Sequence, residues 1–208
     1  MKQNKSLCPA RPVACSLGRL AEEGARVRDI MRVTGSGNLT REVELRATKS
    51  GADAEATFRA LTGATQAERA ALGDAVLDGH YVEVKKATSS TLNQVRAVKY
   101  ITLVAFFVPT EQWYVVPANE IVRQCAAKRR GQHTENPFES ATLSVGNLAG
   151  CRLADVAQLR MAVLDAIAEA ERFPTLKNLM DEVLENSRLL AQKSVADVRE
   201  ALHGYGLA

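Results

Sequence analysis

The sequence predicts a mixed α/β domain of the α+β kind, with a central mixed sheet flanked by helices and further helices added at both ends. Residues 74–86 look like two short strands around a tight turn, and residues 100–109 form the near-continuous apolar run of a buried strand. Residues 153–173 carry apolar side chains at the three- and four-residue spacings of a helix. With 208 residues, 46% of them hydrophobic, the chain is long enough to bury a core.

The elements before the tight turn are predicted from periodicity and from glycine positions. Residues 17–33 fit a helix, and residues 41–47 alternate as a short strand does. Residues 50–63 fit a second helix, which a serine caps and a glycine ends. No obvious strand lies between this helix and residue 73.

After the turn, residues 91–98 are predicted as a short helix, and residues 113–117 as a strand that follows the buried one. Residues 117–131 form an amphipathic helix between a proline and a glycine, and residues 132–145 a loop with a strand at its end. Pro174 should stop the long helix over 153–173. Two further helices are expected over 175–191 and 194–204.

Charge is unevenly distributed along the chain, and it suggests three regions. Residues 1–50 hold 10 Lys and Arg against 5 Asp and Glu, whereas residues 151–208 hold 7 against 9, and the net charge is +3. We expect a basic, helical extension over 1–50, a core domain over 51–150, and a helical region over 151–208 that serves packing, dimerisation or DNA contact. A basic first quarter is compatible with a polyanionic partner, but charge alone favours a solvated face.

The cysteines and the hydropathy suggest a cytoplasmic protein. No CxxC pair occurs, and the histidines do not complete a zinc pattern, so buried reduced thiols are the expected state. The amino terminus lacks an apolar run of signal-peptide length, and no segment approaches the roughly 18–20 apolar residues that span a bilayer. We therefore expect no membrane association. The cysteines are Cys8, Cys15, Cys125 and Cys151.

The tight turn over 74–86 has charged residues at defined positions. Asp78-Gly79 is a strong signal for a two-residue hairpin turn, because both centres of a type I′ turn need positive φ. The resulting register places Asp74 directly opposite Glu83, where Cβ atoms lie about 4.5–5.5 Å apart. Lys85, two residues further along the strand, shares their face.

Two opposed carboxylates destabilise a sheet unless something compensates them. A divalent cation would do so, and Mg²⁺ prefers oxygen ligands and retains several waters. Lys85 would then position or activate the attacking water beside Asp74 and Glu83, while the bound metal lowers the pKa of its water. The alternative is an edge hairpin whose charges form a solvated salt-bridge face. The buried strand that follows favours the first interpretation.

The segment GDAVLDGHYVEVKKA, residues 73–87, resembles the core motif of the PD-(D/E)XK nuclease superfamily, the fold of many restriction endonucleases. In that motif an acidic residue ends one strand and Glu-x-Lys lies on the next. The resemblance implies a restriction-endonuclease-like sheet in which Asp74, Glu83 and Lys85 are catalytic. It also implies that Asp74, Glu83 and the Val84 carbonyl bind the metal, with Glu55 of the first helix as an additional ligand.

The resemblance covers a quarter to a third of the chain and has departures. Gly73 stands where the motif has proline. Asp78 could also match the acidic position, but its place in the turn makes Asp74 the better choice.

The resemblance implies a Mg²⁺-dependent DNA endonuclease, with Mn²⁺ as a substitute metal, that hydrolyses phosphodiester bonds and leaves a 5′-phosphate. A type II restriction enzyme is the first expectation, acting on double-stranded DNA as a homodimer without a nucleotide cofactor. A repair or junction-resolving nuclease of the same fold is one alternative. A catalytically silent DNA-binding protein with a nuclease fold is the other.

Several further residues have an auxiliary or DNA-contacting interpretation beside a simpler one. A glutamine in the helix after Glu-x-Lys resembles a recurrent auxiliary position, but a surface helix explains it equally well. The basic cluster at 128–130 suits a helix carboxyl terminus on dipole grounds, and it suits phosphate contacts if the chain is a nuclease. The residues concerned are Lys86, Gln94, Arg96, Lys128, Arg129, Arg130 and His133.

Overall fold

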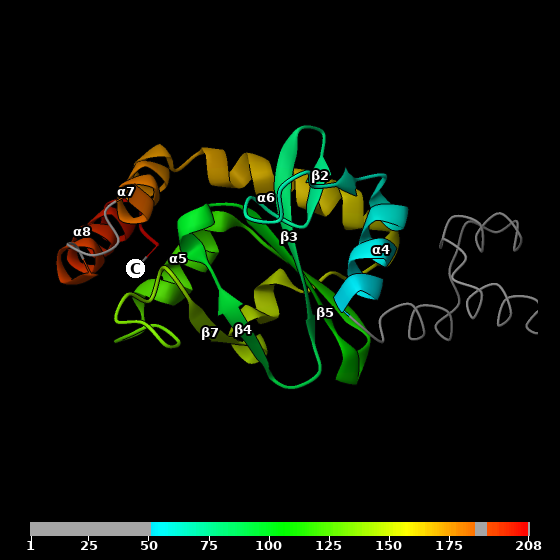
Figure 1. Cartoon of the computed structure of the whole chain (residues 1–208), viewed down its shortest axis with the longest axis horizontal. Helices are drawn as coiled ribbons and strands as arrows, with labels where there is room; N and C mark the ends of the chain where they lie inside the picture. Colours follow the sequence, from blue (N-terminus) through cyan, green and yellow to red (C-terminus); the bar gives the residue numbers. More distant parts are fainter. Residues whose placement is uncertain (1–50, 186–190, 208) are drawn as a thin grey trace, which may run out of the picture.

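The computed structural model describes residues 51–185 and 191–207 (Figure 1). The helix predicted over 17–33, the strand predicted over 41–47 and the basic extension as a whole lie outside the described residues. Within the described part the domain is α+β, with a mixed sheet flanked by helices. No helix among these residues is long and apolar enough to cross a membrane.

The main sheet has five strands in the order β1-β2-β3-β5-β6. Its strands β3 and β5 are parallel, and the other neighbours are antiparallel. The strand that the sequence left unassigned before residue 73 is the two-residue β1. The bounds are β1 Thr65–Gln66, β2 Ala75–Leu77, β3 His80–Ala87, β5 Thr102–Phe107 and β6 Gln112–Val116.

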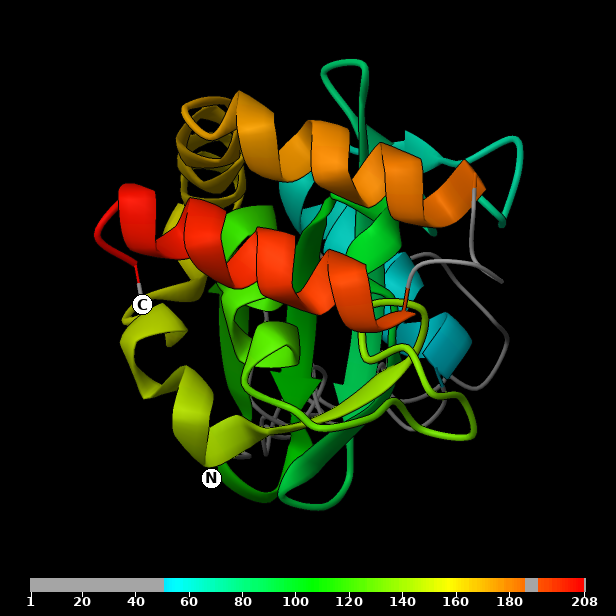
Figure 2. The ribbon, with the colours of Figure 1, turned by 90° about the vertical axis from the view of Figure 1, so that its left-hand side faces the viewer.

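Alternate residues of β5 face two separate cores, which explains its unbroken apolar sequence. Val104 and Phe106 join the core beneath α4 (Gly51–Thr62) and α6 (Leu159–Glu171). Leu103 and Ala105 join the opposite core, which includes residues of α5, α7 and α8. Figure 2 shows α7 and α8 running side by side in front of the sheet. These helices cover Ala118–Ala126, Pro174–Glu185 and Ala191–Gly204.

The prediction of a short helix over 91–98 is wrong. This segment forms strand β4 (Thr91–Val95), which pairs with β7 (Ala141–Ser144) in a separate two-stranded sheet. A register shift between Leu92 and Val95 lets both side chains reach the core although they are three residues apart. The bulge thus imitates the apolar spacing of a helix.

Two helices are shorter than the sequence predicts. Helix α5 ends at Ala126, so the basic residues 128–130 lie beyond its last turn, where the helix dipole has little effect. The long helix begins only at Leu159, because Asp155 caps a preceding 3-10 turn by accepting a hydrogen bond from the Ala157 N–H at 2.9 Å. The 3-10 segments are η1 Ala97–Lys99, η2 Val108–Thr110, η3 Val145–Cys151 and η4 Val156–Gln158.

We expect Gly131→Ala to lower the free energy of unfolding by about 2 kcal/mol, because there is no room for a methyl group. A Cβ at Gly131 would lie 2.5 Å from the Asn136 carbonyl oxygen and 2.6 Å from that of Ser140. Chemical denaturation measures the change. Gly150→Ala is the matched control, since its Cβ would meet nothing within 4 Å. Equal stabilities for the two variants would contradict the prediction.

Candidate functional site

The predicted hairpin is confirmed over three residue pairs. Strands β2 and β3 pair Ala75 with Val82, Val76 with Tyr81 and Leu77 with His80. The turn centres have positive φ, 48° for the aspartate and 86° for the glycine of the Asp-Gly dipeptide, as a type I′ turn requires. The ladder therefore brings the start of β2 next to the middle of β3.

Asp74 does not form the predicted fourth pair with Glu83. The strand pairing ends at Ala75, and the Asp74 N–H donates to the Val82 carbonyl oxygen at 2.9 Å. Its carboxylate accepts a hydrogen bond from the Val84 N–H at 2.8 Å. The Asp74 side chain is therefore held against the backbone of the Glu-x-Lys segment. Gly73 suits this close approach, because a Cβ there would lie 3.1 Å from the Val82 carbonyl oxygen.

Glu83 is held between two ammonium groups. Lys85 Nζ lies 3.1 Å from Glu83 Oε1, and Lys99 Nζ lies 2.7 Å from Glu83 Oε2. The three side chains are 15% exposed for Glu83, 21% for Lys85 and 11% for Lys99. Lys99, the last residue of η1, was not predicted from the sequence to lie at this site. No motif spacing marks this lysine, because its position depends on how the chain returns from β4 to β5.

The two carboxylates of the hairpin differ in their electrostatics. Burial raises the pKa of Asp74, the hydrogen bond from Val84 opposes that rise, and the charge of Glu83 adds to it. Burial would also raise the pKa of Glu83, but the hydrogen bond from Lys99 and the charge of Lys85 outweigh it, and the pKa falls below its ordinary value. Glu83 is thus the firmly ionised member of the pair.

Glu55 lies within electrostatic range of the same two carboxylates. Burial raises its pKa, and the charge of Asp74 raises it further, while Arg59 lowers it and Glu83 makes a smaller upward contribution. Its carboxylate lies 3.6 Å from the Arg59 guanidinium, one helical turn along α4. The helix thus turns Glu55 toward the hairpin but gives it an arginine partner.

The Asp74 and Glu83 carboxylates are the candidate ligands for a hard divalent cation. Among the described residues, no three or more His, Cys, Asp and Glu side chains form a group that could hold a metal ion. Mg²⁺ needs only one or two carboxylates, because it keeps several waters. Asp74 has one oxygen outside its bond to Val84, and Glu83 has an oxygen that Lys99 occupies. The other Glu83 oxygen lies beside Lys85, so a cation would have to displace an ammonium group to bind Glu83.

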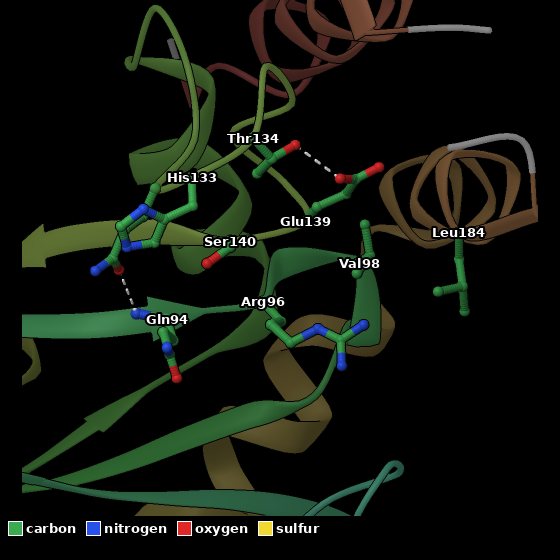
Figure 3. Close-up of a pocket in the computed structure, with 9 residues that line it drawn as sticks. Gln94, Arg96, Val98, His133, Thr134, Glu139, Ser140 and Leu184 are labelled. Carbon is green, nitrogen blue, oxygen red and sulfur yellow. Dashed lines mark hydrogen bonds between the residues drawn. The ribbon is translucent and has the colours of Figure 1, made fainter. Parts of the chain in front are cut away.

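Three of the predicted auxiliary residues lie around one open hollow, of ≈ 560 Å³ (Figure 3). Gln94 lies in β4, Arg96 directly follows β4, and His133 lies in the loop after α5. Gln94 is not on a helix: it has a φ of 54°, and its N–H donates to Gln132 Oε1 at 2.8 Å. Gln94 therefore lacks the helical position on which its predicted auxiliary role depended.

The other auxiliary residues lie elsewhere. Lys86 points to the opposite face of β3 from Lys85, as strand alternation requires. The basic residues 128–130 are not among those that line the hollow. Asp78 is a centre of the turn, and its carboxylate forms an ion pair with the Arg160 guanidinium at 2.8 Å. Of the cysteines in the described residues, Cys125 is buried and Cys151 half-buried, both as free thiols.

The comparisons with known proteins add no relative. The chain matches no protein-family model, no curated protein and no solved structure. Functional inference therefore depends on the geometry of the Asp74, Glu83, Lys85 and Lys99 side chains.

Proposed function

We propose that this chain is a Mg²⁺-dependent endodeoxyribonuclease of the restriction type that hydrolyses phosphodiester bonds in double-stranded DNA. The observation that supports this most directly is that two ammonium groups hold the Glu83 carboxylate, while the Asp74 carboxylate accepts a hydrogen bond from the adjacent Val84 N–H. The order of Asp74 and the segment Glu83-Val84-Lys85 on adjacent strands supports membership of the PD-(D/E)XK superfamily. Mn²⁺ is the expected substitute metal.

Each side chain has a distinct role in this proposal. Asp74 and Glu83 would hold the metal, with the Val84 carbonyl and Glu55 as additional ligands. The bound metal would lower the pKa of a coordinated water and neutralise charge on the phosphate. Lys85 orients the attacking water, and Lys99 faces the phosphate oxygens when it leaves Glu83. The attacking water releases a proton to solvent as its oxygen bonds to phosphorus, the bond to the 3′ oxygen breaks, and that oxygen takes up a proton from solvent. The products carry a 5′-phosphate and a 3′-hydroxyl.

Cutting both strands at one position requires two such sites, so a homodimer is part of the proposal. Discrete fragments from plasmid DNA are expected of a restriction-type enzyme. Nicking, or a preference for branched substrates, would instead favour a repair or junction-resolving nuclease. DNA binding without cleavage under any divalent ion would favour a catalytically silent protein.

We expect Lys85→Ala to lower the cleavage rate about 10²–10³-fold, because it removes the ammonium group that orients the attacking water. The test is cleavage of plasmid and phage DNA by the full chain with Mg²⁺, followed by gel electrophoresis. Lys177→Ala is the matched control, since Lys177 is exposed on α7. Equal rates for the two variants would remove Lys85 from the site, and the absence of cleavage by the unaltered chain would defeat the proposal.

A further inference from the structure

The hollow beside η1 does not include the carboxylates of the hairpin. The short segment η1 connects the two. We propose that this hollow binds a phosphate of the DNA backbone. This phosphate neighbours the scissile phosphate on the same strand, and Arg96 and His133 are its contacts. This inference rests on the proposed nuclease function and adds a second contact point for the substrate. Gln94, Gln132, Thr134 and Ser140 also line the hollow (Figure 3).

Hydrogen bonds fix the shape of the wall that carries His133. The Gln132 N–H donates to the Ser140 carbonyl oxygen at 2.6 Å and closes the loop over 132–140. Within this loop, the Phe138 N–H donates to Asn136 Oδ1 at 2.9 Å, and the Phe138 side chain is fully buried. The Val98 N–H donates to the Phe138 carbonyl oxygen at 3.1 Å, which ties the loop to η1. The hollow therefore has a preformed wall.

Two residues at the hollow adopt backbone conformations that few side chains adopt. Gln94 has a φ of 54° and His133 a φ of 64°. Left-handed conformations cost free energy for residues other than glycine, and they persist where surrounding contacts impose them. The bond from the Gln94 N–H to Gln132 Oε1 joins the two segments at this point. Strain on both sides of one concave surface suggests a binding role.

The hollow has polar and apolar lining residues, and Arg96 supplies its guanidinium group. Arg96 and His133 are exposed, and neither makes a side-chain hydrogen bond or ion pair with another of the described residues. Glu139 is the carboxylate among the lining residues, and Thr134 donates to it at 2.8 Å. In Figure 3 the Arg96 side chain extends away from His133 and lies below Val98 and Glu139. An unpaired guanidinium beside donor groups favours a phosphate, which accepts hydrogen bonds at every exposed oxygen.

The single turn of η1 connects this hollow to the hairpin carboxylates. Arg96 is the residue that precedes η1, and Lys99, its last residue, donates to Glu83. A 3-10 helix rises about 2 Å per residue, so the two positions are separated by roughly 6 Å along the axis. A strand with its scissile phosphate at Lys99 would bring a neighbouring phosphate to Arg96. The contact is to the backbone and carries no base specificity.

The test measures DNA affinity as a function of salt. We use fluorescence anisotropy with a labelled duplex oligonucleotide and full-length Asp74→Asn protein, so that the DNA stays intact. Adding Arg96→Gln should weaken binding about 5–10-fold and reduce the slope of log K against log salt by about 0.9, the value for one phosphate contact. His133→Ala should weaken binding less. Arg172→Gln is the matched control, since Arg172 is exposed and outside the hollow.

The outcomes separate this inference from the proposed function. Tight binding with the same affinity and salt slope after Arg96→Gln would overturn the inference and leave the nuclease proposal intact. No binding of DNA by the parent protein would overturn both. An Arg96-dependent rise in melting temperature with inorganic phosphate, together with Arg96-independent DNA affinity, would identify a small-anion site and overturn the DNA contact.

Discussion

Asp74→Asn is expected to reduce phosphodiester cleavage at least about 10³-fold while making the fold more stable. The asparagine oxygen can still accept the hydrogen bond from the Val84 N–H, so the local geometry is retained. What is lost is a negative charge close to Glu83, which is a metal ligand in the proposed mechanism. Removing that like-charge repulsion should raise the free energy of unfolding by roughly 0.5–1 kcal/mol.

The matched control for this prediction is Asp78→Asn. Asparagine-glycine is also a favoured type I′ turn, so the hairpin should be retained, and cleavage should stay at the level of the unaltered protein. Cleavage assays with Mg²⁺ and urea denaturation of the same samples provide both measurements. If Asp74→Asn cuts normally and Asp78→Asn does not, the acidic position of the motif has been assigned to the wrong aspartate.

The stability gain of Asp74→Asn should depend on pH. Because the pKa of Asp74 is raised above its ordinary 3.8, the folded protein binds this proton more tightly than the unfolded chain does. Ionisation of Asp74 therefore lowers the free energy of unfolding. The full loss is present at neutral pH, and there is no loss at a pH where the carboxyl is protonated in both the folded and the unfolded state. The difference between the variant and the unaltered protein should shrink as the pH falls toward 4. A difference that stays constant from pH 7 to pH 4 would contradict this account.

Lys99→Met is expected to increase the affinity for a divalent cation about 5–10-fold and to lower the cleavage rate about 10–100-fold. Lys99 occupies Glu83 Oε2 at 2.7 Å, the same oxygen that a cation would take. Removing the ammonium eliminates that competition, whereas the reacting phosphate loses a positive charge. Methionine preserves the length and most of the apolar contacts of the half-buried side chain.

Titration calorimetry with Mg²⁺ or Mn²⁺, without DNA, measures the affinity independently of activity. Lys177→Met on the exposed face of α7 should change neither quantity. A fall in cation affinity on Lys99→Met would show that Lys99 supports the ligand geometry of Glu83. Unchanged affinity and unchanged cleavage would exclude Lys99 from the site.

Local chemistry made the hairpin predictable from the sequence. The Asp78-Gly79 dipeptide adopts positive φ at two successive positions, and this sets the pairing of the next three residues on each side. The run over 100–109 likewise identified β5, because only a strand buried on both faces needs apolar side chains at every position. These features depend on neighbouring residues or on composition.

The tertiary structure decided what distant segments contribute. Leu92 and Val95 look helical at a spacing of three, and only the pairing of β4 with β7 makes their bulge favourable. Lys99 reaches Glu83 because η1 closes onto the end of the sheet, and the hollow exists because the loop over 132–140 packs on η1.

The sequence by itself determined the hairpin and the neighbouring positions of Glu83 and Lys85 on its second strand. The fold decided the rest: the Asp74 carboxylate bonds to the Val84 N–H across the strand, and a second lysine neutralises Glu83. The physical reason is the distance along the chain over which each interaction acts. Turn and strand preferences act over a few residues, whereas the position of a side chain 14 residues beyond Lys85 depends on the packing of the whole sheet.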